Sequence, residues 1–277
     1  MSFRAVALVA SVLLASACGE SSAVTPARQP ASEHLAPAPA AVPASPVATA
    51  ETPRAGPDAA PGDPPRTDPE ASAPLTELAG RFEAVRETAG KAPEKWEWFL
   101  WRREARVETR ETLGGAGEVW ERDAAGRVGG HLKVFHAERR VIEYVPGDLA
   151  ALGATTEWDT VTSVFPEARL ASLRRVGDAQ VLGRAAVRYA GRLGAAEYDV
   201  TWIPSLRLPG AVRKAADGQF LSFRLREVHP FAASPWAPPD ASSYQVTEFS
   251  DVGCGSTDPF LRRFHAYLAS ANHAMCR

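Results

Sequence analysis

The sequence predicts an α+β domain built on one strongly curved antiparallel sheet, an incomplete β-barrel covered by a few helices. Three observations support this prediction. Apolar and polar residues alternate along many short segments, turn sequences rich in Gly and Asp separate these segments, and only a few stretches have helical spacing. Period-two alternation is typical of antiparallel strands with one face in water. A long series of such strands with few helices indicates the α+β class.

The first element of the folded part has helical spacing. Thr76 can serve as an N-cap, and Leu78, Phe82 and Val85 follow it at intervals of three to four residues. This pattern favours a helix with one apolar face. The sequence AGKAP, residues 89–93, contains the Gly and Pro that end helices. We therefore expect the domain to open with a helix.

A long β region follows this stretch. Apolar residues occupy every second position of EYDVTW (197–202) and FLSFRLRE (220–227). The turn sequences LGGAG, DAAG, PGD and ADGQ separate the strands. In EYDVTW we expect the three apolar residues to share a buried face, with Glu197, Asp199 and Thr201 on the other face. Further segments extend the series: 96–111, 117–123, 132–137, 141–145 and 185–191.

Three more helices are expected. GDLAAL (147–152) and TEWDTVTSVF (156–165) interrupt the strands, and the second places Trp158, Val161 and Phe165 on one face. The last helix begins with Asp258 as N-cap and Pro259 in its first turn, and it runs through residues 260–276.

One face of the predicted sheet concentrates large apolar side chains. Acyl chains need a long, dry groove lined by such residues. The same residues can instead fill an ordinary core between sheet and helices, and both interpretations stay open at this point. The candidate ligand-binding residues are Trp98, Leu100, Tyr189, Tyr198, Val200, Trp202, Leu221, Phe223 and Leu225.

The pattern VLGRAAVRYAG…YDVTWIPSLRLPGAVRK…DGQFLSFRL resembles the lipoprotein carrier and receptor proteins of the Lol pathway, LolA and LolB, and the sigma-regulator RseB. The most specific part is the strand that ends in Trp202, followed by IPSLRLP. The resemblance covers about residues 75–228 and implies a curved, incomplete barrel, plugged by helices, whose apolar cavity accepts acyl chains. The proline-rich segment near the N-terminus and the segment after residue 250 are not parts of those proteins.

The N-terminus reads as an export signal. The apolar run from Ala5 to Leu14 is too short to cross a bilayer and has the size of a signal-peptide core, so residues 1–17 are interpreted as a signal peptide. The small residues before Cys18 resemble the lipobox of bacterial lipoproteins, which implies that Cys18 is acylated. An ordinary A-x-A cut would instead leave Cys18 as a free thiol. By the sorting rule of enteric bacteria, Gly19 favours the outer membrane.

Residues 18–74 are predicted to be a disordered linker behind this anchor. From Gly19 to Pro74 the chain has 13 of its 23 prolines and no aromatic residue, so it cannot bury enough apolar surface to offset its chain entropy. The linker is acidic, and the rest of the chain is close to neutral. This balance gives no indication of a nucleic-acid partner.

The two remaining cysteines are expected to form a disulfide. With Cys18 acylated, Cys254 and Cys276 are left in an oxidising compartment, where we expect a structural disulfide that holds the last helix. The alternative is that neither cysteine pairs. The sequence contains no C-x-x-C that would suggest redox catalysis.

Motifs of enzymes are absent from the sequence. It contains no G-x-S-x-G, H-E-x-x-H, P-loop or dinucleotide-binding pattern. His131 and His136 are five residues apart in a predicted strand, so they should lie on opposite faces and cannot chelate one metal ion. The charged run RREARVETRE, residues 102–111, is interpreted as a solvated strand face. No catalytic residue, metal site or cofactor is predicted.

The function expected from these observations is a non-catalytic lipoprotein of the cell outer membrane that faces the periplasm. It would bind a hydrophobic or lipidated ligand, such as an acyl chain or another lipoprotein, in a domain formed by residues 75–277. The alternative is an envelope sensor or assembly protein that contacts a protein partner and has no lipid ligand. An envelope hydrolase is a third possibility, and it would require clustered polar side chains inside the cavity.

Overall fold

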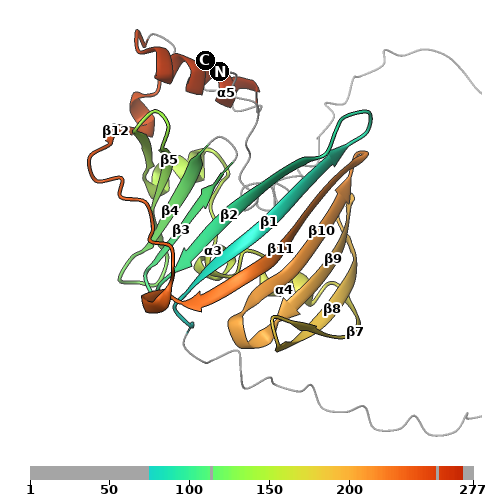
Figure 1. Ribbon diagram of the computed structural model, residues 1–277. Helices are drawn as coiled ribbons and strands as arrows, with labels where there is room; N and C mark the ends of the chain where they lie inside the picture. Colours follow the sequence, from blue (N-terminus) through green and yellow to red (C-terminus); the bar gives the residue numbers. More distant parts are fainter. Residues whose placement is uncertain (1–74, 113–114, 254–255, 271–277) are drawn as a thin grey trace, which may run out of the picture. The chain divides into compact units, whose positions relative to one another are not determined.

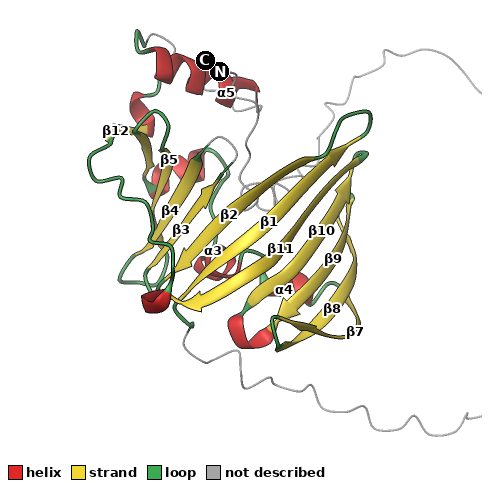
Figure 2. Ribbon diagram, in the orientation of Figure 1, coloured by secondary structure: helices red, strands yellow, loops and turns green. Residues whose placement is uncertain are grey.

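The computed structural model describes residues 75–112, 115–253 and 256–270. Within these ranges one large, strongly curved sheet is accompanied by a few short helices, as Figures 1 and 2 show. The sheet does not close on itself. The predicted α+β class with an incomplete barrel is therefore confirmed.

The elements follow one another along the chain as bounded here. The strands are β1 (Leu78–Thr88), β2 (Glu94–Arg102), β3 (Arg106–Glu111), β4 (Ala116–Arg122), β5 (Val128–Phe135), β6 (Arg140–Tyr144), β7 (Arg174–Val181), β8 (Arg184–Leu193), β9 (Ala196–Ile203), β10 (Leu208–Ala216), β11 (Gln219–Pro230) and β12 (Gln245–Glu248). The α-helices are α2 (Pro146–Ala151), α3 (Trp158–Ser163), α4 (Glu167–Leu170) and α5 (Pro259–Ser270), and the 3-10 turns are η2 (Pro204–Leu206), η3 (Phe231–Ala233) and η4 (Phe249–Asp251).

The strands of the described residues form a single sheet in the order β12-β6-β5-β4-β3-β2-β1-β11-β10-β9-β8-β7. All neighbouring pairs are antiparallel except β12 and β6, which run parallel. The antiparallel pairing of β1 with β11 joins the start of the domain to a strand about 140 residues later in the chain. Two series of sequential antiparallel strands therefore meet at β1.

The predicted first helix is wrong, because residues Leu78–Thr88 form strand β1. Leu78 and Phe82 are four residues apart, a spacing that fits one face of a strand as well as one turn of a helix. Val85 lies on the face opposite Phe82, together with charged neighbours. Long pairing with β2 and β11 on both sides outweighs the local helical preference.

The predicted register of β9 is confirmed. Tyr198 and Val200 are each 2% exposed, whereas Asp199 between them is exposed. We call the face of the sheet that carries Tyr198, Phe82 and Phe223 the inner face, and the opposite face the outer face. The main hydrophobic core lies on the inner face.

The predicted helical interruption lies between β6 and β7, where α2, α3 and α4 pack against the inner face. Trp158, Val161 and Phe165 are all buried, as expected. Helix α3 ends at Ser163, because the next residue, Val164, has a positive φ of 65° that cannot continue a right-handed helix. We call residues 146–170 the helical cover.

The N-cap of the last helix is also confirmed. Asp258 Oδ1 accepts a hydrogen bond from the backbone N–H of Phe260 at 2.7 Å, at the start of α5. Phe260 and Phe264 pack edge-on against Phe135 of β5. The predicted continuation to residue 276 lies outside the described residues. No helix in the described ranges is long and apolar enough to cross a membrane.

The described residues cover part of the width of the outer face. The segment between β11 and β12 runs along the outer side of β2–β6 (Figure 1). Trp101 Nε1 donates a 3.1 Å hydrogen bond to the carbonyl of Trp236 in this segment. Tyr244 packs on a small cluster formed by Val119, Val134 and Val141.

Candidate functional site

The candidate ligand-binding residues lie together on the inner face. Eight of the nine predicted residues are buried there in one hydrophobic cluster, and Tyr189 is half-buried against it. They come from β2, β8, β9 and β11, which are brought together by the pairing of β1 with β11. The buried eight are Trp98, Leu100, Tyr198, Val200, Trp202, Leu221, Phe223 and Leu225.

Aromatic rings form the centre of this surface. The rings of Phe82 and Trp98 are stacked, with centroids 4.1 Å apart and an interplanar angle of 7°. Phe223 meets both rings edge-on, at centroid distances of 5.9 and 5.8 Å. Such edge-to-face contacts add to the free energy of burial. The three strands β1, β2 and β11 thus share one aromatic contact.

The helical cover packs directly against the aromatic side chains of the inner face. Phe165 contacts Tyr198 edge-on at 5.8 Å, and Val161, Val164 and Leu170 belong to the same cluster. In this structure the apolar inner face is therefore a packed core. Its role toward a ligand stays a prediction, because a ligand would have to displace part of the cover.

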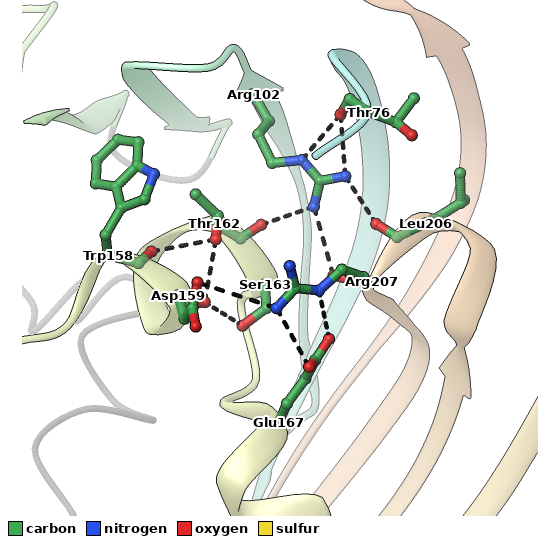
Figure 3. Close-up of polar contacts among 9 residues, drawn as sticks. All are labelled: Thr76, Arg102, Trp158, Asp159, Thr162, Ser163, Glu167, Leu206 and Arg207. Carbon is green, nitrogen blue, oxygen red and sulfur yellow. Dashed lines mark hydrogen bonds and ion pairs between the residues drawn. The ribbon is translucent and has the colours of Figure 1, made fainter. Parts of the chain in front are cut away.

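A buried arginine joins the cover to the sheet (Figure 3). Arg102 is 0% exposed, and it donates hydrogen bonds to main-chain carbonyl oxygens. Nη1 donates to Thr162 at 2.9 Å, Nη2 donates to Leu206 at 2.7 Å, and Nε and Nη2 both donate to Thr76 at 3.1 Å. Burial lowers the pKa of Arg102 to about 10, so the guanidinium stays charged at neutral pH.

A second arginine holds the cover from the side of β10. Arg207 follows η2 in a left-handed conformation, with φ of 47°. It makes a bidentate pair with Glu167 of α4, with Nε–Oε1 at 2.7 Å and Nη2–Oε2 at 3.2 Å. The hydrogen bond to Glu167 raises the pKa of Arg207. Arg102 and Arg207 therefore fix the cover at the same end of the sheet.

Sequence reasoning missed a polar cluster on the inner face of β3, β4 and β5. Glu111 and Glu118 are each 1% exposed, and Lys133 lies directly across from Glu118 in the register of β4 and β5. Burial is the largest effect on Glu111 and raises its pKa to about 8, with Lys133 lowering it and Glu118 raising it. Glu111 is therefore mostly protonated at neutral pH.

His131 is the neutral member of this cluster. Burial lowers its pKa to about 4, and its ring stacks on Trp120 with centroids 3.8 Å apart. Trp120 Nε1 donates to Glu118 Oε2 at 3.3 Å. The prediction that His131 and His136 lie on opposite faces is supported, because His136 contacts Tyr244 on the outer side.

Several buried polar atoms of the inner face and of the helical cover have no hydrogen-bond partner among the described residues. They include the indole N–H groups of Trp96, Trp98 and Trp158, Thr109 Oγ1 and Glu111 Oε1. Buried polar groups are nearly always paired in folded proteins, with protein or with ordered water. Each of these groups can form a hydrogen bond with a ligand or with water, the indole N–H groups as donors.

The charged run of residues 102–111 is therefore not a solvated strand face, and this prediction was wrong. Arg102 and Glu111, at its two ends, are among the most deeply buried side chains of the described residues. Arg102 continues the inner-face alternation of Trp98 and Leu100 by two residues, which is the signal that could have identified it. Glu111 lies directly across from Trp98 in the pairing of β2 with β3. The turn at residues 103–105 sets this register.

Other predicted sites cannot be placed. Cys18, Cys254 and Cys276 lie outside the described residues. In the part of the chain that is described, no three His, Cys, Asp or Glu side chains gather as a metal ion would require.

Comparisons with known proteins give likenesses of fold. No protein-family model and no curated protein matches the chain. Among solved structures, the chain is similar to one in the Pseudomonas aeruginosa MucA/MucB complex, with 20% identity and a TM-score of 0.35 over 61% of this chain. This match spans only 55% of the other chain.

Two further solved structures are similar to the chain over about the same share of its length. One is a putative outer membrane lipoprotein-sorting protein domain from Vibrio parahaemolyticus, with 9% identity, coverage of 57% of this chain and 87% of the other, and a TM-score of 0.27. The other is a LolA superfamily protein from Nitrosomonas europaea, with 6% identity, coverage of 57% and 88%, and a TM-score of 0.27. All three TM-scores lie below 0.5, so these likenesses describe the fold alone and assign no function to this chain.

Proposed function

We propose that the protein is a non-catalytic, lipid-anchored envelope protein that binds an acylated ligand on the inner face, beneath the helical cover. The acyl chain would lie against the apolar side chains of β1, β2, β9 and β11. The ester or amide that links the chain to its head group would accept hydrogen bonds from buried indole N–H groups. The ligand would enter by displacing the helical cover.

The observation that carries this proposal is the set of unpartnered indole N–H donors within an apolar surface. Trp96, Trp98 and Trp158 are each at least nine-tenths buried, and the Nε1 of each has no partner among the described residues. An ordinary core gains nothing from buried donors without acceptors, because their desolvation costs free energy. An acyl ester supplies a carbonyl acceptor for the indole N–H donors and an apolar chain for the surrounding apolar side chains.

A pair of tryptophan variants tests the role of these donors. Trp98→Phe keeps an aromatic ring but removes an unpartnered donor, so we expect the affinity for monopalmitoyl glycerol to fall about tenfold. Trp101→Phe is the matched control, since its indole N–H is already bonded to Trp236 on the outer face. It should leave the affinity unchanged and lower the free energy of unfolding. Binding is measured by native mass spectrometry and by titration of tryptophan fluorescence, using detergent-free protein.

The chain used in this experiment carries Cys18→Ser, so that a covalent acyl group cannot be mistaken for a bound ligand. A protein that shows only its own mass and no saturable binding of monopalmitoyl glycerol would contradict the proposal. That outcome would favour the alternative function, an envelope protein that contacts another protein without a lipid.

The lipid anchor has its own test. We expect Cys18→Ser to abolish acylation, so that the chain is either released from membranes or left unprocessed. Membrane fractionation and intact-mass measurement of the expressed protein distinguish these forms. A mature form of the variant that stays tightly bound to the outer membrane would contradict the anchor.

The disulfide between Cys254 and Cys276 is tested by thiol titration of denatured, unreduced protein. The bond leaves neither cysteine reactive, whereas two reactive thiols in an acylated chain would exclude it. A bond that closes this short loop is expected to contribute roughly 3 kcal/mol to the free energy of unfolding.

A further inference from the structure

The outer face of β8–β11 has a pocket of about 430 Å³, on the side of the sheet opposite the helical cover. Figure 1 shows these strands side by side, beyond the half of the sheet that the β11–β12 segment crosses. The outward-facing side chains that line the pocket are Glu83, Val85, Arg188, Asp199, Thr201, Ala211, Arg213, Ser222, Arg224 and Arg226.

The strand register explains the hollow. Arg224, Ala211, Thr201 and Arg188 stand in one row across β11, β10, β9 and β8. Two small side chains therefore form a floor between two long arginines, which are three strand spacings, or roughly 14 Å, apart along the sheet. Arg213 stands on β10 in the neighbouring row, between Ser222 and Asp199, and adds a third cation to the rim.

Three of the four arginines are available to a ligand. Arg226 is occupied, because it makes a bidentate pair with Glu83 at 2.9 Å to each oxygen. Arg188, Arg213 and Arg224 are exposed and have no ion pair with another described residue. The guanidinium of Arg213 lies 4.7 Å from the ring centroid of Phe220, a stacking contact that holds its plane while its N–H groups stay free.

The charge of the pocket fits a phosphate dianion. Asp199 is the carboxylate left to oppose the three free arginines, because Glu83 is taken up by Arg226. This leaves a net charge of about +2, and guanidinium forks match the geometry of phosphate oxygens. Thr201 and Ser222 add hydroxyl donors on the floor.

We propose that this outer-face pocket, formed by Arg188, Arg213 and Arg224 over Ala211 and Thr201, binds a phosphate ester. Phosphate esters occur both on lipid head groups and on soluble molecules, and the same chemistry would recognise either. The pocket lies on the face opposite the proposed acyl-binding surface. A negative result for one proposal therefore does not contradict the other. Together they would allow the domain to bind an acyl chain and a phosphate at once.

The test compares two triple variants with the same change in charge. The site variant is Arg188→Gln, Arg213→Gln and Arg224→Gln. The control is Arg174→Gln, Arg184→Gln and Arg192→Gln, three exposed arginines of β7 and β8 outside the pocket. All proteins are full-length chains with Cys18→Ser, so that the predicted anchor does not itself hold them to vesicles.

Each protein is titrated with glycerol 1-phosphate by calorimetry, and sedimented with phosphatidylcholine vesicles that contain or lack phosphatidic acid. We expect the site variant to bind the phosphate ester at least tenfold more weakly, and the control variant to bind within twofold of the parent. Binding of glycerol 1-phosphate indicates a soluble ester, and binding only to phosphatidic acid vesicles indicates a lipid head group. The proposal is overturned if the parent binds neither probe, or if both triple variants weaken binding equally.

Discussion

Arg102 on β2 donates a hydrogen bond from Nη1 to the carbonyl oxygen of Thr162, 2.9 Å away near the end of α3. The last carbonyls of a helix have no partner within it and form the negative end of its dipole. A buried guanidinium is therefore a suitable partner for them. The same side chain also bonds to Thr76 before β1 and to Leu206 in η2, so three distant parts of the chain depend on it.

Replacing Arg102 should be costly for this reason. Arg102→Met keeps the length of the side chain but leaves several buried carbonyls without a donor. We expect the free energy of unfolding to fall by about 3 kcal/mol, measured by urea denaturation at pH 7. Arg127→Met is the control, because the Arg127 side chain is 79% exposed, and it should change stability by less than about 0.5 kcal/mol. Equal effects of the two substitutions would contradict the role of Arg102.

The Arg207–Glu167 pair should control the local stability of the helical cover. Glu167→Gln weakens the bidentate bond between α4 and the chain after η2. We expect amide hydrogen exchange over residues 158–170 to speed up about fivefold, while exchange in β9 stays unchanged. Glu157→Gln, an exposed residue just before α3, should leave both regions as they are. Faster exchange throughout the sheet would indicate a global effect and would contradict this assignment.

The strands of the second half of the domain could be predicted from sequence because their alternation is clean and their turns are short. In residues 197–202 of β9 and 221–226 of β11, apolar residues alternate with charged or small polar ones, so the buried face is defined without knowledge of the fold. The last helix was also predictable, since Asp258 and Pro259 mark its start through local chemistry.

The errors arose where distant contacts decide the structure. Residues 78–88 became a strand because β2 and β11 pair with both of its edges, and a local pattern cannot show this. Arg102 and Glu111 were assigned to solvent because charged residues are seldom buried. Arg102 is compensated by main-chain carbonyls from other elements, and burial keeps Glu111 mostly protonated by raising its pKa. Only the folded chain provides these surroundings.

Phe223 tests the division of β11 into two faces. Its ring contacts both Phe82 and Trp98, and it is 2% exposed. Phe223→Ala should lower the free energy of unfolding by roughly 3–5 kcal/mol through lost burial and a cavity. The adjacent Arg224→Ala removes an exposed side chain on the outer face and should cost less than about 0.5 kcal/mol. A larger loss for Arg224→Ala than for Phe223→Ala in urea denaturation would mean that the register is wrong by one residue.

Glu111 should make the protein less stable as the pH rises. Its pKa of about 8 in the folded state lies above the ordinary value of 4.5. Between these two pH values the unfolded chain has lost a proton that the folded protein keeps, so the free energy of unfolding falls as the pH rises. His131 and His136 act in the opposite direction, because burial lowers the pKa of each to about 4. Their stabilising contribution is present above pH 6.5 and is lost as the pH falls toward 4.

Glu111→Gln isolates the carboxyl group from these histidines, because it mimics the protonated acid at every pH. We expect the stability of the variant relative to the parent to rise by about 3 kcal/mol between pH 5 and pH 8, measured by urea denaturation across that range. Glu87→Gln, at an exposed position of β1, should show a constant difference. A flat difference for Glu111→Gln as well would mean that Glu111 is already ionised at pH 5, stabilised by Lys133 and Arg86 more strongly than burial opposes it.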